Sequence, residues 1–201
     1  MGFLRRNTSN LMDQKSCRAQ YWKMKLTSAL MRFAARNWFW LTIGVYPVSN
    51  SLAGWQPLLD SKLSHWEVFM GVPHSSVTGL SAGTPSSDKQ GEGTPLGLGN
   101  DPKRVFSVIE EAGQPALKIT GEIYGGLTSR EEFGDFHFSA QVKWGEKKWP
   151  PRLDQKRDSG FLYHCTGPHG AFWKVWMRCV EFQVQEDDFG DLFMLAGTGG
   201  N

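Results

Sequence analysis

Two stretches decide the fold class: RDSGFLYHC at Arg157–Cys165 and WMRCVEFQVQEDD at Trp176–Asp188. Both alternate apolar and polar residues, and side chains in a β-strand point to opposite faces in turn. The second stretch therefore predicts a strand with an apolar face and a polar face. The apolar face comprises Trp176, Val180, Phe182 and Val184, and the polar face comprises Glu181, Gln183 and Gln185.

The same alternation applied to the first stretch also separates two faces. One comprises Phe161, Tyr163 and Cys165, and the other comprises Asp158, Leu162 and His164. If the two polar faces belong to one sheet, two acids, an amide and an imidazole converge on one surface. We expect that surface to carry the chemistry of the protein.

The rest of the chain from about residue 54 also has the pattern of an all-β domain. Residues 136–144 alternate most regularly, with Phe136, Phe138, Ala140, Val142 and Trp144 on one side. Short apolar runs separated by Gly- and Pro-containing turns, with no convincing helix, are typical of an antiparallel sandwich. The 201 residues suffice for one domain. The net charge of +2, without a long basic run, gives no indication of a nucleic-acid partner.

The N-terminal region has the layout of an export signal. Residues 31–53 begin with Arg32 and Arg36, continue with an apolar run from Trp38 to Val48, and end in small residues up to Ala53. We expect a signal-peptide helix that is cleaved after Ala53, and a mature domain at 54–201 that is secreted, periplasmic or bound at the cell surface. The apolar run is short for a membrane span, so no stable span is expected after cleavage. Residues 1–30 have no clear period, and we interpret them as a spurious or disordered extension.

The three cysteines, Cys17, Cys165 and Cys179, have no metal-ligand spacing. Because the alternation puts Cys165 on the aromatic face of its strand and Cys179 on the polar face of the other, two separate thiols are favoured over a disulfide.

Several segments carry a resemblance to a known family: WEVFMGVPH, GLGNDPKRVFSV, LKITGEIYGGLTS, KWGEKKWPPR, KRDSGFLYHCTGPHG and VEFQVQEDDFGD. From about Trp55 onward the chain resembles the 3-keto-disaccharide hydrolase domain family. The resemblance implies a concanavalin-like jelly-roll sandwich and cleavage of glycosides already oxidised to a ketone at C3. The visible strands are too few for a complete jelly roll, so we expect a C-terminally truncated domain.

Three residues are candidates for catalysis. Asp158-Ser159-Gly160 matches the family's Asn/Asp-Ser-Gly motif, although such a triplet also forms turns. Glu181-x-Gln183 matches a Glu-x-Gln pattern, although polar alternation also produces a solvated outer face. A carboxylate over an apolar floor can have a raised pKa and act as a base. His164 shares the predicted face of Asp158, against the alternative of a structural histidine.

Further residues are candidates for binding the substrate or a cofactor. The substrate candidates are Gln183, Arg157, Tyr163, Trp176 and Glu186. Solvation in a loop or turn is the alternative for Arg157 and Glu186. A divalent metal ion is a candidate cofactor, because imidazoles and carboxylates suit such ions, although the spacing matches no specific motif. Its candidate ligands are His164, Glu181, Asp158 and His169.

The predicted activity is elimination followed by hydration on a small carbohydrate substrate. A ketone at C3 acidifies the hydrogen on C2, a base removes it, the C1 substituent leaves, and water adds to the product. Glu181 and His164 are both candidates for the base. A bound cation and Arg157 are both candidates for the group that stabilises the enolate. The alternative function is a non-catalytic, lectin-like carbohydrate-binding module, because the same sandwich hosts lectins.

Overall fold

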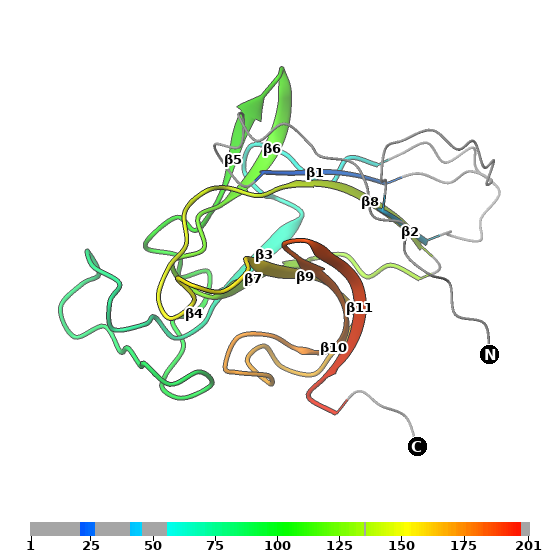
Figure 1. Cartoon of the computed structure of the whole chain (residues 1–201). Coiled ribbons are helices and arrows are strands. Elements are labelled where there is room, and N and C mark those ends of the chain that lie inside the picture. Colours follow the sequence, from blue (N-terminus) through cyan, green and yellow to red (C-terminus); the bar gives the residue numbers. More distant parts are fainter. Residues whose placement is uncertain (1–20, 27–40, 46–55, 135, 198–201) are drawn as a thin grey trace.

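A computed structural model describes residues 21–26, 41–45, 56–134 and 136–197 (Figure 1). Every regular element in these ranges is a β-strand, and the ranges contain no helix. The strands are β1 (Tyr21–Leu26), β2 (Leu41–Val45), β3 (Trp66–Met70), β4 (Gly97–Leu98), β5 (Phe106–Glu111), β6 (Gln114–Ile119), β7 (Gly125–Ser129), β8 (Phe136–Lys143), β9 (Asp158–Thr166), β10 (Arg178–Gln185) and β11 (Asp188–Leu195).

The described strands form three antiparallel sheets. Their orders are β2-β8-β1-β6-β5, β11-β10-β9 and β4-β3-β7. Figure 1 shows the five-stranded sheet and the β9–β10–β11 sheet as separate layers, with β3 and β7 beside them. The predicted fold class is therefore confirmed: the domain is all-β and antiparallel, consistent with a jelly-roll sandwich.

The core lies between the five-stranded sheet and the β9–β10–β11 sheet. Buried Leu117 of β6 and Ala140 of β8 cluster with Val184 of β10, which is fully buried. Phe138 of β8 meets Phe161 of β9 edge to face, with ring centroids 5.2 Å apart. This packing confirms that the apolar sides of β8 and β10 face each other. The opposite, polar side of β10 is thereby turned away from the core.

The pairing of β9 with β10 positions the candidate site. Gln185 lies opposite Asp158, Gln183 opposite Gly160, and Glu181 opposite Leu162. The predicted polar faces therefore do lie on one sheet. Asp158-Ser159-Gly160 forms the first part of β9 rather than a turn.

The alternation predicted for β9 fails after Tyr163, because the strand contains a β-bulge. Tyr163 pairs with Val180, but Thr166 pairs with Arg178, so β9 has one more residue than β10 in this interval. His164 has a left-handed φ of 53° at this point. The bulge reverses the parity of the residues that follow. The expectation that Cys165 lies on the aromatic face is therefore wrong, whereas the expectation that His164 shares the face of Asp158 stays a prediction.

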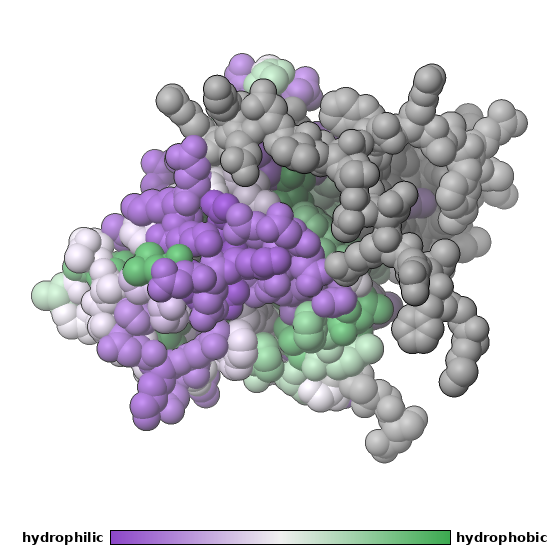
Figure 2. Space-filling model, viewed as in Figure 1, coloured by the Kyte–Doolittle hydropathy of each residue, from purple (hydrophilic) through white to green (hydrophobic). Residues whose placement is uncertain are grey.

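Strand β11 forms one edge of its described sheet and exposes large apolar side chains. Phe189, Leu192, Phe193 and Met194 are all about half exposed. Figure 2 shows apolar residues at the lower right of the described part, where Figure 1 places β10 and β11. Hydrophilic residues cover most of the remaining face in view.

Most of the predicted export segment lies outside the described residues. Within residues 31–53, only 41–45 are described, and they form β2, antiparallel to β8, rather than a helix. Within residues 1–30, Tyr21–Leu26 form β1, which pairs with β6 and β8. In the described ranges, no helix is long and apolar enough to cross a bilayer. Cleavage after Ala53 stays a prediction.

Candidate functional site

A cleft of about 1260 Å³ is lined by the polar face of β10, by residues from both faces of β9 and by apolar residues of the opposite sheet such as Leu117 and Phe138. Its lining includes the polar side chains predicted from the sequence and several aromatic residues from loops. The polar residues are Asp158, Glu181, Gln183 and Gln185, and the aromatic residues include Tyr124, Trp149, Trp173 and Trp176. Clefts that combine aromatic walls with a few convergent polar groups are the usual form of small-molecule sites.

The side chain of Glu181 lies across the backbone of Gly160. A Cβ atom added to Gly160 would be only 2.7 Å from both Cγ and Cδ of Glu181. The carboxylate can therefore occupy this place only because residue 160 has no side chain. The apolar side chain of Leu162 stands opposite Glu181 on the neighbouring strand, so one side of the carboxyl group is shielded from water.

Burial and, to a smaller extent, the negative charge of Asp158 together raise the pKa of Glu181 to about 7. Burial also raises the pKa of Asp158, and the Arg152 guanidinium opposes that rise. A carboxylate is less stable in its charged form where water is excluded, and also where another negative charge is near, so each of these conditions raises its pKa. The charge of Asp158 thus makes Glu181 harder to ionise, while Arg152 favours the ionised form of Asp158.

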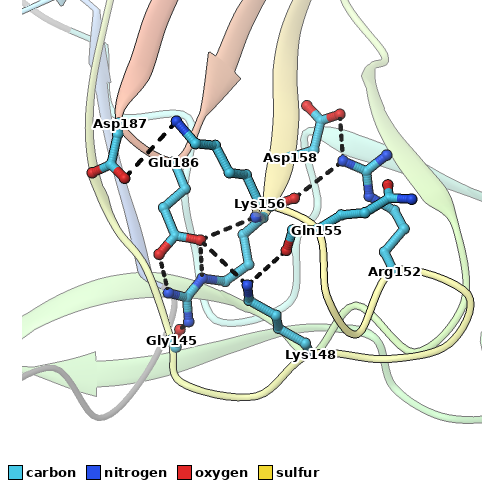
Figure 3. Close-up of polar contacts among 9 residues, drawn as sticks. Gly145, Lys148, Arg152, Gln155, Lys156, Asp158, Glu186 and Asp187 are labelled. Carbon is cyan, nitrogen blue, oxygen red and sulfur yellow. Dashed lines mark hydrogen bonds and ion pairs between the residues drawn. The ribbon is translucent and has the colours of Figure 1, made fainter.

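Asp158 has a set of partners that fixes its orientation. Arg152 Nη2 is 3.1 Å from Asp158 Oδ2 and also donates to the carbonyl oxygen of Lys156 at 3.1 Å. Gln183 Nε2 donates to Asp158 Oδ1 at 2.5 Å, and Gln185 contributes a further hydrogen bond. Figure 3 shows Arg152 directed toward Asp158 across the start of β9. Gln183 therefore orients a site carboxylate, a role beyond the substrate contact predicted for it.

Sequence reasoning missed Tyr124 and Arg152 as members of the site. Burial raises the pKa of the Tyr124 phenol, and the charges of Arg152 and Asp158 also act on it, in opposite directions. These three side chains therefore share one electrostatic environment. Tyr124 lies just before β7 and Arg152 lies in the loop between β8 and β9. No local spacing in the sequence connects them, because the tertiary fold alone brings them to Asp158.

Arg157 and Glu186 form a clamp between the start of β9 and the end of β10. The Arg157 guanidinium is ion-paired with the Glu186 carboxylate, and Arg157 Nε donates to Glu186 Oε2 at 3.2 Å. The backbone N–H of Arg157 also donates to Glu186 Oε2 at 3.1 Å, and the backbone N–H of Glu186 donates to the carbonyl oxygen of Arg157 at 2.9 Å. Lys148 adds a contact at 3.9 Å, visible in Figure 3. This arrangement lowers the pKa of Glu186, with the Arg157 hydrogen bond as the largest cause, and it engages both charges within the protein.

Aromatic side chains from the loop between β9 and β10 form one wall of the cleft. Trp176 precedes β10 instead of lying on it, and its indole nitrogen donates to the carbonyl oxygen of Gly125 at 3.3 Å. The ring of Tyr124 meets Trp176 edge to face at 6.0 Å. Phe172 stacks on Trp173 at 4.7 Å, and Trp173 is 42% exposed. Planar aromatic faces of this kind suit the apolar faces of sugar rings.

The remaining predicted residues take separate places. His164 is exposed at the bulge, with its ring 5.3 Å from that of Tyr163, and both line the cleft. His169 stacks on Phe69 at 4.9 Å and lies 3.9 Å from Glu67 Oε2.

The candidate metal ligands are not assembled into a metal site. Among the described residues, no group of three or more His, Cys, Asp or Glu side chains is placed to share a metal ion. Asp158 is instead occupied by a guanidinium. The predicted set of His164, Glu181, Asp158 and His169 is therefore not formed, and the residues present do not fit a divalent ion.

The bulge brings the two described cysteines together. Both are thiols in this structure, and their side chains are hydrogen-bonded to each other. The prediction of two thiols agrees with the structure, but its reason was wrong: Cys165 and Cys179 lie on the same face of the sheet.

A comparison with family models identifies the family of the chain. A model described as a 3-keto-alpha-glucoside-1,2-lyase-like domain matches residues 54–199. The chain belongs to this family. The match confirms the resemblance and covers β3 to β11, so the strands that carry Asp158 and Glu181 are part of the 3-keto-alpha-glucoside-1,2-lyase-like domain. The name of the family points to enzymes that act on 3-keto-glycosides. Neither a curated protein nor a solved structure matches the chain.

Proposed function

We propose that this domain cleaves 3-keto-glycosides by elimination and hydration, with Glu181 as the base. The observation that carries the proposal is the environment of Glu181: a carboxyl group over Gly160 in an aromatic-walled cleft, with a pKa raised to about 7. A base is most effective when its pKa lies near the working pH, since it is then ionised and still binds a proton strongly. An exposed carboxylate would be ionised at neutral pH but would bind a proton only weakly.

In the first step, the Glu181 carboxylate removes the hydrogen from C2 of the sugar. The ketone at C3 makes this hydrogen acidic, because the negative charge left by its removal spreads onto the C3 oxygen. The electron pair then forms the C1–C2 double bond, the bond between C1 and the glycosidic oxygen breaks, and the leaving oxygen takes up a proton from solvent, which regains one when water adds to C1. The products are an unsaturated 3-keto sugar and the free aglycone.

The charge that develops on the C3 oxygen needs a positive or hydrogen-bond-donating partner. Arg152 is better placed for this role than Arg157, since it lies beside Asp158 and Tyr124 while Arg157 is clamped to Glu186. The raised pKa of Tyr124 keeps its phenol protonated and able to donate. Asp158 holds Arg152 in place and raises the pKa of Glu181. No step requires a metal ion.

In the second step, water adds to C1 of the unsaturated sugar, and C2 receives a proton. Glu181, which became protonated in the first step, exchanges that proton with solvent as the aglycone leaves and water enters, and then protonates C2. The two steps together amount to hydrolysis, and they leave Glu181 in its original state. His164, the other candidate base, is exposed to solvent at the bulge, whereas the side chain of Glu181 is partly buried.

Deuterium labelling distinguishes this route from direct displacement at C1. The protein is incubated in D₂O with a 3-keto-glucoside, and the released sugar is analysed by NMR. Elimination and hydration place deuterium at C2, whereas displacement leaves the original hydrogen. The released 3-keto sugar alone in D₂O serves as the control for spontaneous exchange. Cleavage without deuterium at C2 above that control would overturn the proposal.

Substitution tests the assigned base. Glu181→Gln keeps the shape of the side chain but cannot accept the proton, and loss of a general base typically costs about 100- to 10,000-fold in rate. Glu92→Gln is the matched control, since Glu92 is an exposed carboxylate outside the cleft. Binding of the substrate by Glu181→Gln, measured by calorimetry, should remain near normal. A wild-type protein that binds the glycoside without any turnover would instead support the lectin-like alternative.

A further inference from the structure

The hydrogen-bonded thiols of Cys165 and Cys179 lie at the base of the aromatic loop, defined as residues 166–178. Cys165 is near the end of β9 and Cys179 is near the start of β10. The pairs Tyr163–Val180 and Thr166–Arg178 bracket the two cysteines. The thiols are therefore held together by the strand pairing on both sides, and their proximity does not depend on a mobile surface segment.

We propose that Cys165 and Cys179 form a redox modification site, in which exchange with a low-molecular-weight disulfide produces a cross-strand disulfide that closes the aromatic loop. This proposal is independent of the proposed catalytic function, because neither thiol takes part in the elimination or the hydration.

Thiol–disulfide exchange requires an accessible thiol that ionises readily, and the two thiols differ in both accessibility and pKa. Cys165 is half-buried and lines the cleft, whereas Cys179 is fully buried. The hydrogen bond from the Cys179 thiol lowers the pKa of Cys165. The same hydrogen bond, burial and the nearby Glu181 raise the pKa of Cys179. Cys165 is thus the thiol that a small disulfide can reach and that ionises first, and the thiolate is the nucleophile in exchange.

The reaction balances with a small disulfide such as oxidised glutathione as the oxidant. The Cys165 thiolate attacks one sulfur of the oxidant, forms a mixed disulfide and releases one small thiol. Cys179 loses its proton to solvent and attacks Cys165, which forms the Cys165–Cys179 bond and releases the second small thiol. The protein loses two hydrogens and two electrons, and the oxidant is reduced to two thiols.

The consequence for the site follows from what the loop carries. Phe172, Trp173 and Trp176 form the aromatic wall, and Val175 is buried at 3% exposure. A disulfide at the base of this loop reduces the number of conformations that the loop can adopt when it unfolds. Oxidation would therefore stabilise the wall of the cleft in the arrangement seen here, two residues away from Glu181.

The experiment uses the full chain with Cys17→Ser, so that only the two cysteines of the pair remain. The protein is treated with oxidised glutathione under native conditions, then analysed by thiol titration, intact mass and peptide mapping. We expect loss of both thiols, a mass lower by two hydrogens and a crosslinked peptide pair containing Cys165 and Cys179. We also expect a higher melting temperature, reversed by a reductant.

Single substitutions in the same background provide the controls. Cys179→Ser should accumulate a glutathione adduct at Cys165, because no second thiol resolves it. Cys165→Ser should retain its buried thiol. Oxidation in guanidinium should shift the product toward glutathione adducts, because unfolding separates the pair. Retention of both thiols in the native Cys17→Ser protein, or a stable glutathione adduct instead of the crosslink, would overturn the proposal.

Discussion

The contact between Glu181 and Gly160 makes Gly160→Ala the sharpest test of the site. The backbone of Gly160 is not in the left-handed region, so alanine is compatible with its conformation. The strand itself should gain slightly, since glycine within a strand is less stable than alanine by about 0.5–1 kcal/mol. The cost falls on Glu181, whose side chain occupies the space that the new methyl group needs.

The size of the effect follows from the distances. The added Cβ would be 2.7 Å from Cγ and Cδ of Glu181, whereas carbon atoms in ordinary contact are about 3.5–4.0 Å apart. The carboxyl group must therefore move by about 1 Å. A displacement of about 1 Å in a catalytic group can reduce the rate about 100-fold. We expect kcat/KM to fall by that factor, which corresponds to about 2.7 kcal/mol of lost transition-state stabilisation.

The assay is steady-state cleavage of a 3-keto-glucoside, with thermal unfolding measured in parallel. Gly134→Ala is the matched control, because an added Cβ there meets no atom within 4 Å. Combining Gly160→Ala with Glu181→Asp should recover part of the lost activity relative to Gly160→Ala alone, since the shorter acid relieves the overlap. A folded Gly160→Ala protein with full turnover would refute the argument that the position of Glu181 matters.

Four further results are expected. The kcat/KM should rise with pH through about 7 as Glu181 ionises, and Asp158→Asn should move this rise to lower pH, because it removes the negative charge that raises the pKa of Glu181. The pKa of Glu181 is higher in the folded protein than its ordinary value of 4.5, so wild-type stability should fall between about pH 5 and pH 8, and the melting temperature of Glu181→Gln relative to wild type should increase over that range. Arg157→Gln should lower the free energy of unfolding in urea by about 1–3 kcal/mol, because it leaves Glu186 without its principal charged partner. Mass spectrometry of exported protein should show a start at residue 54, and a mature protein that retains Trp38–Val48 would contradict the export prediction.

The sequence was sufficient to predict the all-β class and the polar face of β10. Alternation over residues 180–185 is strict, and a strand that is apolar on one side and polar on the other can bury only one of them. The joint position of Asp158 and Glu181 followed from the same rule applied to two neighbouring strands. That inference needed no long-range information beyond the assumption that the strands share a sheet.

Other parts of the site could not be predicted from local patterns. A one-residue bulge reverses the alternation of β9 after Tyr163, and no composition rule marked His164 as the extra residue. Arg152 and Tyr124 reach Asp158 from separate loops, so only the assembled fold shows their proximity. Arg157 and Glu186 are charged residues of the kind that line sugar sites, but in the structure they form an ion pair with each other.

The bulge at His164 divides β9 into two segments that can change independently. Residues 158–162 keep their orientation through pairing with Gln185, Gln183 and Glu181, while residues beyond the bulge take theirs from the extra residue. Deleting His164 would remove the bulge and leave both segments in register, with Cys165 opposite Cys179 on the face that carries Glu181. A single-residue deletion, usually the most disruptive change to a strand, is thus accommodated at this position while the end that holds the carboxylates is preserved. The strand therefore offers protein engineering a place where its length can change by one residue without turning a side chain to the other face.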